Sequence, residues 1–595
     1  MVRVYRVMAG RRKIRHPYFT ITPKPMRLWT TVTFGEPDTF LLYRFRNISV
    51  RFAHATRPHP RLRNKSSGPS HFSHPHGRSR RSHQTPGFLS PHSMKSLPIA
   101  FLMISAFLIP LMITNESIWL DEAVTASFAT QPDFPSWRLR LHEEVGPDCQ
   151  MPLTLLVGWV FGKMWGAAEW QLRAVNVLWA LLALVGFWKA GRVLRVAALP
   201  LALAMQPFFW LYTNEARPYS LQIALGAWLL FGTVQFVQVR GAGAAWAVSF
   251  GGAAVVLAYT TILAPVTIAV CALSLVVVAV RQRWKIERRA WVIMGAAAVA
   301  MLPAAWYYYQ TLLGTGKGSQ LWEADAKSLA YVIYEMVGLT GLGPPVQSLR
   351  EMAPSFHGAA LFTHLAPQLT LGLVCILALT LVLFLGLKER VAEEEPTALL
   401  AVTFPVLVGT ATFFLVSVLT HKVFWARHLA PLFPFYVVFV TIAAYRAMRG
   451  RHRLVGAVSI VVLAALLATS SLAIRFGSAH RKEDYRTASA MTKAALLEGK
   501  TVWWVANPLN GTYYGVPFST GLPKEDTAYG LQGGLPAREP SPALELPDLM
   551  VVSRRTDFDN GDRVQKLIAG GKLQPSGHAQ GFTFLSKVPQ SAKPD

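Results

Sequence analysis

The sequence predicts an all-α polytopic membrane protein of about 11 to 13 transmembrane helices, followed by a small C-terminal α/β domain on the outer side of the membrane. Three observations support this class. Of the 595 residues, 52% are hydrophobic and only 15% are charged, whereas a soluble protein carries about 25% charged residues. Several windows reach the roughly 20 apolar residues that span a bilayer. From about residue 477 the composition becomes that of a globular domain.

The transmembrane helices are expected at eleven apolar segments. The first follows Met94, and the others lie near 171–190, 193–212, 217–238, 244–260, 263–281, 290–311, 367–387, 397–420, 428–447 and 454–475. Lys and Arg cluster in alternate short connections, which places these connections and the N-terminus in the cytoplasm. The segment 151–166 is short for a span, and we interpret it as an interfacial or re-entrant helix. Counts of 12 or 13 spans remain open alternatives.

This topology divides the polar features of the transmembrane module, residues 94–476, between two sides. The outer side receives two long loops, 115–170 and 312–366, together with the turn "YTNEARPYS" at 212–220. The cytoplasmic side receives only short basic connections. We therefore expect any chemistry on the outer face.

The first 93 residues form a basic, low-complexity segment. They hold 18 Lys and Arg against two acids, and so supply +16 of the net charge of +27. One interpretation is an arm that binds nucleic acid or anionic lipid. The interpretation we favour is a disordered segment, or a region upstream of a true start at Met94, and we expect no nucleic-acid partner.

Residues 477–595 are expected to fold as a small α/β domain. Helical spacing appears in "KEDYRTASAMTKAALLEGK" (482–500), and "GDRVQKLIAGG" (561–571) indicates a short helix that ends at glycine. Strands are predicted in "TVWWVA" (501–506), "DLMVVS" (548–553) and "GFTFLSK" (581–587). The three cysteines of the chain are too few and too scattered for a disulfide framework or a metal cluster.

Two adjacent acids, Asp121 and Glu122, lie directly after the first span in "NESIWLDEAVTASFA". A carboxylate beside the bilayer is costly unless it has a partner or a use. One acid can act as a general base that deprotonates an attacking hydroxyl or amine, and the pair can help to hold a divalent cation. The structural alternative is a helix start, where acids in the first turn are favourable by themselves.

Two further outer segments carry charge. In "NEARPYS", Glu215 is a candidate second acid and Arg217 a candidate phosphate ligand through its bidentate fork; a simple surface ion pair is the alternative. In "HKVFWARHLAPLFP", Lys422 and Arg427 are cations on the side where the positive-inside rule disfavours them. That exception favours a bound anion, with lipid headgroup contact as the alternative. Acids and cations on one face fit an anionic lipid whose phosphate is a leaving group.

The order of these segments resembles the membrane-embedded GT-C glycosyltransferases, a family that includes the protein O-mannosyltransferases and the lipid A aminoarabinose transferase. The resemblance lies in "WLDEA", "MPLTLLVGWVFGKMWGAAEWQLRAVNVLWALLALVGFWKAGRVL", "QPFFWLYTNEARPYSLQ", "FWARHLAPLFPF" and "KEDYRTAS", and spans about residues 94–490. It implies a polyprenyl-phosphate-linked sugar donor, catalysis at the outer membrane face and, for this chain, a bacterial inner membrane with a periplasmic C-terminal domain.

The resemblance also implies roles for individual residues. Asp121 matches the catalytic acid of the first loop, with Glu122 beside it; Glu215 and Arg217 match the second outer motif, and Arg427 matches a cationic position near the donor phosphate. Relatives carry His or Lys and then Pro before "PLTLL", where this chain has Gln150 and Met151. Gln150 can contact the phosphate only as a neutral donor, so Arg217, Lys422 or Arg427 must supply the charge.

These features together predict an inverting glycosyltransferase that moves a sugar from a polyprenyl-phosphate donor to a lipid, glycan or protein acceptor, with Asp121 as the general base. A divalent cation, Mg²⁺ or Mn²⁺, is an open option through Asp121, Glu215 and Asp148, and no organic cofactor is expected. Two alternatives are a transporter or flippase of lipid-linked precursors, and a non-catalytic scaffold of envelope assembly.

Overall fold

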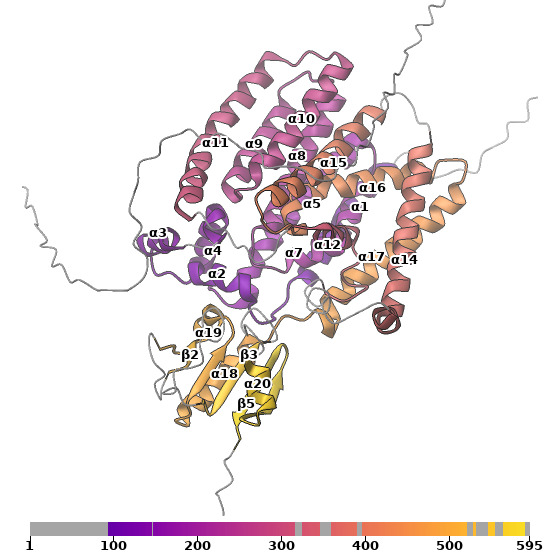
Figure 1. Ribbon diagram of the computed structural model, residues 1–595. Helices are drawn as coiled ribbons and strands as arrows, with labels where there is room; N and C mark the ends of the chain where they lie inside the picture. The colour runs from indigo at the N-terminus through magenta and orange to yellow at the C-terminus, as the bar shows by residue number, and fades with distance from the viewer. Residues whose placement is uncertain are drawn as a thin grey trace, which may run out of the picture. The chain divides into compact units, whose positions relative to one another are not determined.

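The computed structural model describes residues 93–144, 147–315, 324–345, 359–389, 395–519, 527–530, 546–553 and 563–588. Figure 1 shows a large helical part and a small sheet with its own helices. The expectations for residues 1–92 fall outside the described residues, as do parts of the loop 312–366.

The helical part is that of a multi-pass membrane protein. Within the described residues, seven helices are long and apolar enough to cross a bilayer. They are α5 (Glu169–Leu194), α8 (Tyr219–Gln238), α10 (Ala264–Gln282), α11 (Arg288–Thr315), α14 (Ala359–Lys388), α15 (Glu395–Leu419) and α17 (Arg453–Phe476). Three shorter apolar helices accompany them: α1 (Ser93–Met112), α9 (Ala245–Thr260) and α16 (Phe433–Ala447). These ten correspond to ten of the eleven segments expected from the sequence.

The remaining expected span, 193–212, is not one helix. It consists of α6 (Leu199–Ala204) and α7 (Pro207–Thr213), with a break at residues 205–206. The break follows from Pro207, which has no amide proton to continue the α6 ladder. Side chains satisfy the exposed carbonyls, since Trp210 Nε1 donates to the Ala204 oxygen at 2.7 Å and Ser471 Oγ to the Met205 oxygen at 3.1 Å. The break directs α7 toward the turn that carries Glu215 and Arg217.

The first outer loop is itself helical. It contains α2 (Leu120–Ala129), α3 (Phe134–Glu143), the 3₁₀ helix η1 (Pro147–Gln150) and α4 (Pro152–Trp165). Helices α2 and α4 pack closely because Gly158 and Gly162 face Thr125 and Ala129, where a larger side chain would meet the α2 helix. The 14 residues of α4 are the segment that we expected to be interfacial or re-entrant, and that prediction stays open.

Large apolar side chains cover much of the outside of the helices. Phe107, Val280 and Leu454 are each more than 70% exposed, which suits contact with hydrocarbon rather than water. Inside, aromatic side chains such as Phe187 and Phe250 are fully buried. Two shorter elements complete the helical part near the site: α12 (Ala326–Val337) and the 3₁₀ helix η2 (Ala426–Leu429).

The C-terminal part is a five-stranded mixed sheet with helices. After η3 (Ser478–His480) come α18 (Tyr485–Leu497), β1 (Val502–Val505), α19 (Pro508–Tyr513), β2 (Tyr529–Gly530), β3 (Leu549–Ser553), α20 (Arg563–Ala569), β4 (Leu573–Ala579) and β5 (Phe582–Lys587). The strand order is β2-β1-β3-β5-β4, with β1 parallel to β2 and β3, and β5 antiparallel to β3 and β4. Trp504, Tyr485 and Phe582 form its core.

The sequence predicted β1, β3, β5, α18 and α20, which the structure confirms, and it missed β2 and β4. Strand β2 has only two residues. Strand β4, "LQPSGHA", is an edge strand interrupted between Pro575 and Gly577, with exposed side chains at most positions. Pro and Gly weaken the strand signal, and both are tolerated at a sheet edge.

Candidate functional site

The first feature of the site is an ion pair between Asp121 and Arg427. Asp121 is the second residue of α2, and its Oδ2 lies 2.7 Å from Arg427 Nη1 of η2. Both side chains are about one-quarter exposed. The Arg427 guanidinium also lies 5.0 Å from the Trp425 ring centre and 5.9 Å from that of Tyr219, a favourable cation–π arrangement. The fold thus joins two of the predicted site residues across 306 positions of sequence.

Arg427 reaches this place because η2 can approach α8 closely. Gly226 of α8 lies against the backbone of Pro431, and a Cβ at position 226 would collide with the Pro431 carbonyl. Pro431 lies two residues after the end of η2, so the glycine brings the turn that carries Arg427 against α8, which begins at Tyr219.

The second ion pair joins Arg217 and Asp148. Arg217 Nη1 donates to Asp148 Oδ1 and, at 2.9 Å, to the backbone oxygen of Asp121. Arg217 is 6% exposed and Asp148 is 8% exposed. Arg217 therefore ties the turn after α7 to η1 and to the first turn of α2. Asp148, which we predicted as a metal ligand, is engaged by an arginine.

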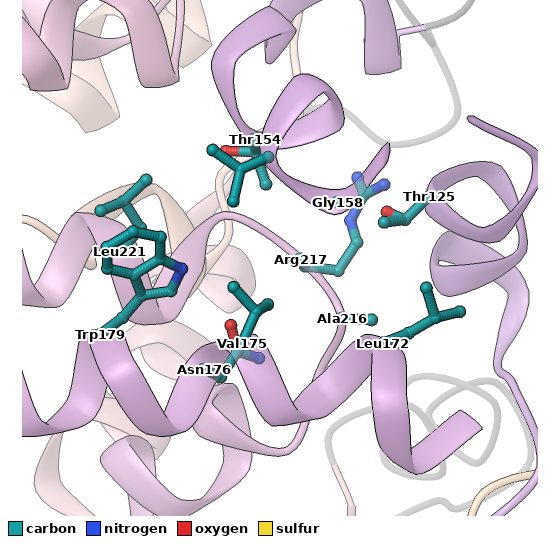
Figure 2. Close-up of a pocket in the computed structure, with 11 residues that line it drawn as sticks. Thr125, Thr154, Gly158, Leu172, Val175, Asn176, Trp179, Ala216, Arg217 and Leu221 are labelled. Atoms are coloured by element: carbon teal, nitrogen blue, oxygen red, sulfur yellow. The ribbon is translucent and has the colours of Figure 1, made fainter. Parts of the chain in front are cut away.

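Arg217 also borders a small cavity of about 20 Å³. Figure 2 shows its side chain extending from the turn toward Gly158 and Thr125, with Leu172, Val175 and Trp179 on the opposite walls. Two of the polar groups that line it, Arg217 Nε and the Thr154 hydroxyl, are buried without a hydrogen-bond partner in the described chain. The cavity is therefore mostly apolar with a cationic edge.

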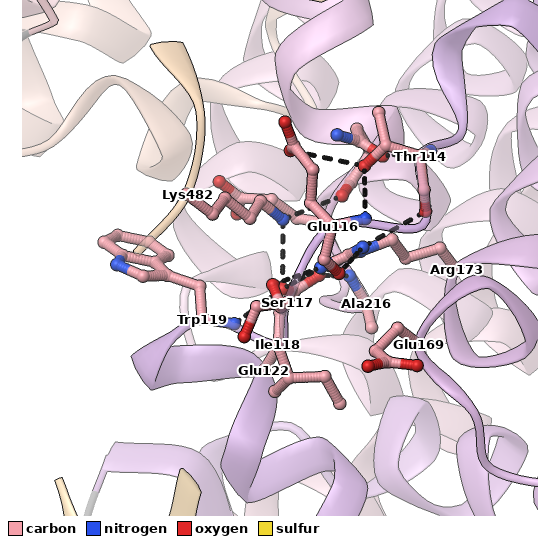
Figure 3. A network of polar contacts seen from close by, with 12 residues as sticks. Thr114, Glu116, Ser117, Ile118, Trp119, Glu122, Glu169, Arg173, Ala216 and Lys482 are labelled. Carbon is pink, nitrogen blue, oxygen red and sulfur yellow. Dashed lines mark hydrogen bonds and ion pairs between the residues drawn. The ribbon is translucent and has the colours of Figure 1, made fainter. Parts of the chain in front are cut away.

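Glu122, next to Asp121 in sequence, has different surroundings. Its carboxylate is fully buried and accepts from Arg173 Nε at 2.8 Å and Arg173 Nη2 at 2.6 Å, a bidentate pair (Figure 3). Lys482 Nζ lies 3.0 Å from the same carboxylate. The amides of Trp119 and Ala216 donate to it at 3.0 and 2.8 Å. Donors enclose both of its oxygens, so the geometry favours a structural role for Glu122, and its predicted catalytic role stays a prediction.

Charge sets the protonation state of Glu122. Burial acts to raise the pKa of its carboxyl, but the positive charges of Arg173 and Lys482, with the hydrogen bonds, hold the pKa well below its usual range. Burial and the nearby Arg173 lower the pKa of the Lys482 ammonium, while Glu122 acts against them. We infer that the three groups form one charged network.

Glu215 is an acid whose pKa is raised toward neutral. Asn176 of α5 fixes its backbone, since Asn176 Nδ2 donates to the carbonyl oxygens of Thr213 and Glu215. The residue is 6% exposed, and no donor of the described chain bonds its carboxylate. Burial, with Glu122 and Asp121 nearby, raises the pKa of Glu215 to about 7, although Lys482 and Arg427 act to lower it. A carboxyl that titrates near neutral pH suits proton transfer.

Two other predicted site residues, Gln150 and Lys422, lie at or just after the ends of helices. Gln150 ends η1, where its backbone oxygen accepts from the Ile262 amide at 3.2 Å, and Lys422 follows α15, where its amide donates to the Ser417 oxygen at 2.9 Å. Their roles toward the donor stay predictions.

The three acids proposed as metal ligands do not gather into one group. Asp121 and Asp148 are paired with different arginines, and the described residues contain no group of three or more His, Cys, Asp or Glu side chains placed to hold a metal. Metal dependence stays a prediction.

Sequence reasoning missed three residues that build the site: Arg173, Asn176 and Lys482. A signal existed for Arg173, because an arginine inside a predicted span requires a buried partner. Asn176 is one turn further along the same helix. Lys482 gave no signal beyond its place in "KEDYR". A buried hydrogen bond of 2.8 Å from Tyr212 to Glu335 of α12 was also unforeseen.

The fold and the site define a multi-pass membrane protein with a charged site at the ends of several helices. No family model matches the chain, and no curated protein matches it in sequence. It is similar to the solved structure of ArnT from Cupriavidus metallidurans in the apo state, with 13% identity and a TM-score of 0.46 over 84% of this chain and 100% of that chain. ArnT from the same organism bound to undecaprenyl phosphate gives 14% identity and a TM-score of 0.43 over 85% and 100%.

Two more solved structures give lower TM-scores. The arabinofuranosyltransferase AftD from Mycobacteria has 15% identity and a TM-score of 0.42, over 84% of this chain and 40% of that chain. The Archaeoglobus fulgidus oligosaccharyltransferase in complex with Zn and sulfate has 13% identity and a TM-score of 0.36, over 66% and 55%.

Proposed function

We propose that this protein is an inverting glycosyltransferase that moves a sugar from a polyprenyl-phosphate donor to an envelope acceptor at the outer face of the bacterial inner membrane. The observation that carries the proposal is the Asp121–Arg427 pair, in which a partly exposed carboxylate and a partly exposed guanidinium meet at 2.7 Å. A base for the acceptor and a ligand for the leaving phosphate are the two groups that such a transfer needs.

In the proposed reaction, the donor phosphate binds Arg427 through the planar fork that matches phosphate oxygens. The phosphate competes with Asp121 for the guanidinium and so releases the carboxylate. The acceptor hydroxyl or amine attacks the anomeric carbon while Asp121 takes its proton. The bond from the anomeric carbon to the phosphate oxygen breaks, and the electron pair leaves with the polyprenyl phosphate, whose charge Arg427 and Arg217 stabilise.

Glu215 is assigned the role of second acid. It lies in the field of Asp121 and Arg427, and in its charged form it accepts a hydrogen bond from the acceptor group and orients it toward Asp121. Because the pKa of Glu215 is raised to about 7, we expect the transfer rate to increase with pH through the neutral range.

The placement of charge supports an enzyme over a transporter. A transporter of lipid-linked precursors needs ionisable groups near the middle of its spans. Here Asp121, Glu215 and Arg427 lie in the first turn of α2, in a turn between helices and in η2, all at helix ends. Buried Arg173 lies only four residues after the start of α5.

The test is mass spectrometry of envelope glycans and lipids from four strains at equal protein level: native, gene-deleted, Asp121→Asn and Asp133→Asn. Asp133 is a matched control in the same outer loop, where it caps α3 through the Ser136 amide, and Asn caps a helix as well as Asp does. A sugar increment lost on deletion and in Asp121→Asn, but kept in Asp133→Asn, supports the proposal and gives the mass of the sugar. Loss on deletion alone would favour the transporter or scaffold alternatives.

A further inference from the structure

The C-terminal part of the chain contributes a side chain to the charged site. Lys482 precedes α18, and its ammonium lies 3.0 Å from the Glu122 carboxylate (Figure 3). The same ammonium donates to the backbone oxygen of Asn214 at 3.0 Å. Its side chain is 12% exposed. One ammonium thus links the first outer loop, which carries Asp121, to the turn that carries Glu215.

Other contacts hold the C-terminal part on the same loop. The Tyr514 hydroxyl, just after α19, accepts from the Ile118 amide at 2.8 Å and lies 3.1 Å from Ser117 Oγ. Asn510 Nδ2 of α19 donates to the Ile118 oxygen at 2.8 Å. Arg486 of α18 pairs with Glu169 at 2.8 Å. The bonds from Tyr514 and Asn510 fix Ser117 and Ile118, just before α2, and therefore the start of the helix that carries Asp121.

We propose that Lys482 is a positioning residue for the sugar transfer. Docking of the C-terminal domain brings its ammonium between Glu122 and the Asn214–Glu215 turn. This contact sets the separation between Asp121 and Glu215 that the reaction uses. The inference rests on the proposed function. It makes the C-terminal domain part of the active enzyme rather than a separate binding module.

The electrostatics of Glu215 give this role a measurable signature. Glu215 is influenced by Lys482 from the segment before α18, by Glu122 and Asp121 of α2, and by Arg427 of η2. Lys482 and Arg427 favour its charged form, and the two acids oppose it. Removal of the Lys482 charge therefore raises the pKa of Glu215. The part of the pH–rate profile in which the rate rises with pH, its acidic limb, then moves to higher pH. A residue with a purely structural role would lower the rate without moving that limb.

The first experiment compares native protein, Lys482→Met, Lys482→Arg and Lys500→Met. The assay uses right-side-out membrane vesicles that contain their own donor and acceptor, buffered between about pH 5 and pH 9, with the sugar increment measured by mass spectrometry. For Lys482→Met we expect the acidic limb to move up by roughly one pH unit, or tenfold in rate at low pH. Lys482→Arg keeps the charge and restores the native limb. Lys500→Met removes an exposed lysine paired with Glu498 and leaves the profile unchanged.

The second experiment is hydrogen exchange on the full-length protein, which needs no substrate. In Lys482→Met we expect faster exchange at the Trp119 and Ala216 amides, which donate to Glu122. In Tyr514→Phe we expect faster exchange at the Ile118 amide, together with a lower transfer rate and an unmoved acidic limb, because no charge is removed.

The outcomes separate this inference from the proposed function. If Asp121→Asn abolishes transfer while Lys482→Met keeps the native rate, pH profile and exchange, Lys482 does not position the site and the inference is wrong. If Asp121→Asn transfers sugar like the native protein, the proposed function fails, whatever the exchange experiment shows.

Discussion

Replacement of Arg173 by methionine should cause the largest loss of stability of any single change at the site. The Arg173 side chain is fully buried and donates five hydrogen bonds, two to Glu122 and three to the backbone oxygens of Thr114, Glu116 and Ser117. Removal of one partner from a buried ion pair costs about 3–5 kcal/mol, because the other charge stays buried. Each carbonyl left without a donor adds about 1 kcal/mol or more. Lys482 compensates part of this, so we expect about 4 kcal/mol.

The assay is thermal unfolding in detergent or nanodiscs, followed by tryptophan fluorescence. A loss of about 4 kcal/mol corresponds to a fall in Tm of roughly 3–4 °C in a protein of this size, because the unfolding entropy is about 2.1 cal/mol/K per residue. The control is Arg289→Met, which removes an arginine whose side chain is 86% exposed and lies 3.9 Å from Glu287; surface pairs contribute about 0–1 kcal/mol. A double variant, Arg173→Met with Glu122→Leu, should recover part of the loss, because it no longer leaves a carboxylate beside an apolar side chain.

Two results would refute this reasoning. Equal Tm values for Arg173→Met and Arg289→Met would mean that the buried network does not stabilise the fold. A double variant less stable than Arg173→Met alone would mean that Glu122 is stabilised by groups other than Arg173.

Three further predictions concern the same region. Glu215→Gln should lower the transfer rate and remove the rise of rate with pH near pH 7, measured in the vesicle assay; a retained rise would assign that titration to another group. Gly226→Ala should push Pro431 and η2 away from α8, with a fall in rate of at least about tenfold, comparable to the loss of positioning, whereas Gly252→Ala, where a Cβ meets open space, should be neutral. The folded-state pKa of Glu122 is lowered. Its contribution to stability is therefore complete above the unfolded pKa of about 4.3 and is lost as the pH falls below it. Tm measured from about pH 6 down to pH 3 should fall less in Glu122→Gln than in native protein.

Much of the fold could be predicted because the membrane restricts the choices. A long apolar run in a bilayer has to be a helix, since no water is present to bond its backbone, and ten of the eleven expected segments are helices. The error at 193–212 has a local cause. Pro207 breaks the segment, but a hydropathy average over 20 residues does not register the missing amide of a proline.

The candidate site was predictable in part, because charged residues at helix ends are visible in the sequence. Asp121, Arg427 and Arg217 were identified one by one, and the structure brings them into one cluster. Which residue pairs with which was not visible. Asp148 meets Arg217 across 69 positions of sequence and Glu122 meets Arg173 across 51, and such pairings depend on helix packing that no local pattern encodes.

The adjacent acids Asp121 and Glu122 illustrate most clearly the difference between a charge that is visible in the sequence and a pairing that helix packing decides. Successive residues of an α-helix point about 100° apart, because the helix has about 3.6 residues per turn. At the start of α2, one of the two side chains therefore faces α5 and the segment before α18, while the other faces η2. The inner acid meets two cations and two amides and is held charged. The outer acid pairs with Arg427, and in the proposed reaction a phosphate binds this arginine instead. The same dipeptide thus supplies one carboxylate that anchors the helix and one to which the proposed reaction assigns the acceptor's proton, and the anchored carboxylate fixes the position of the other.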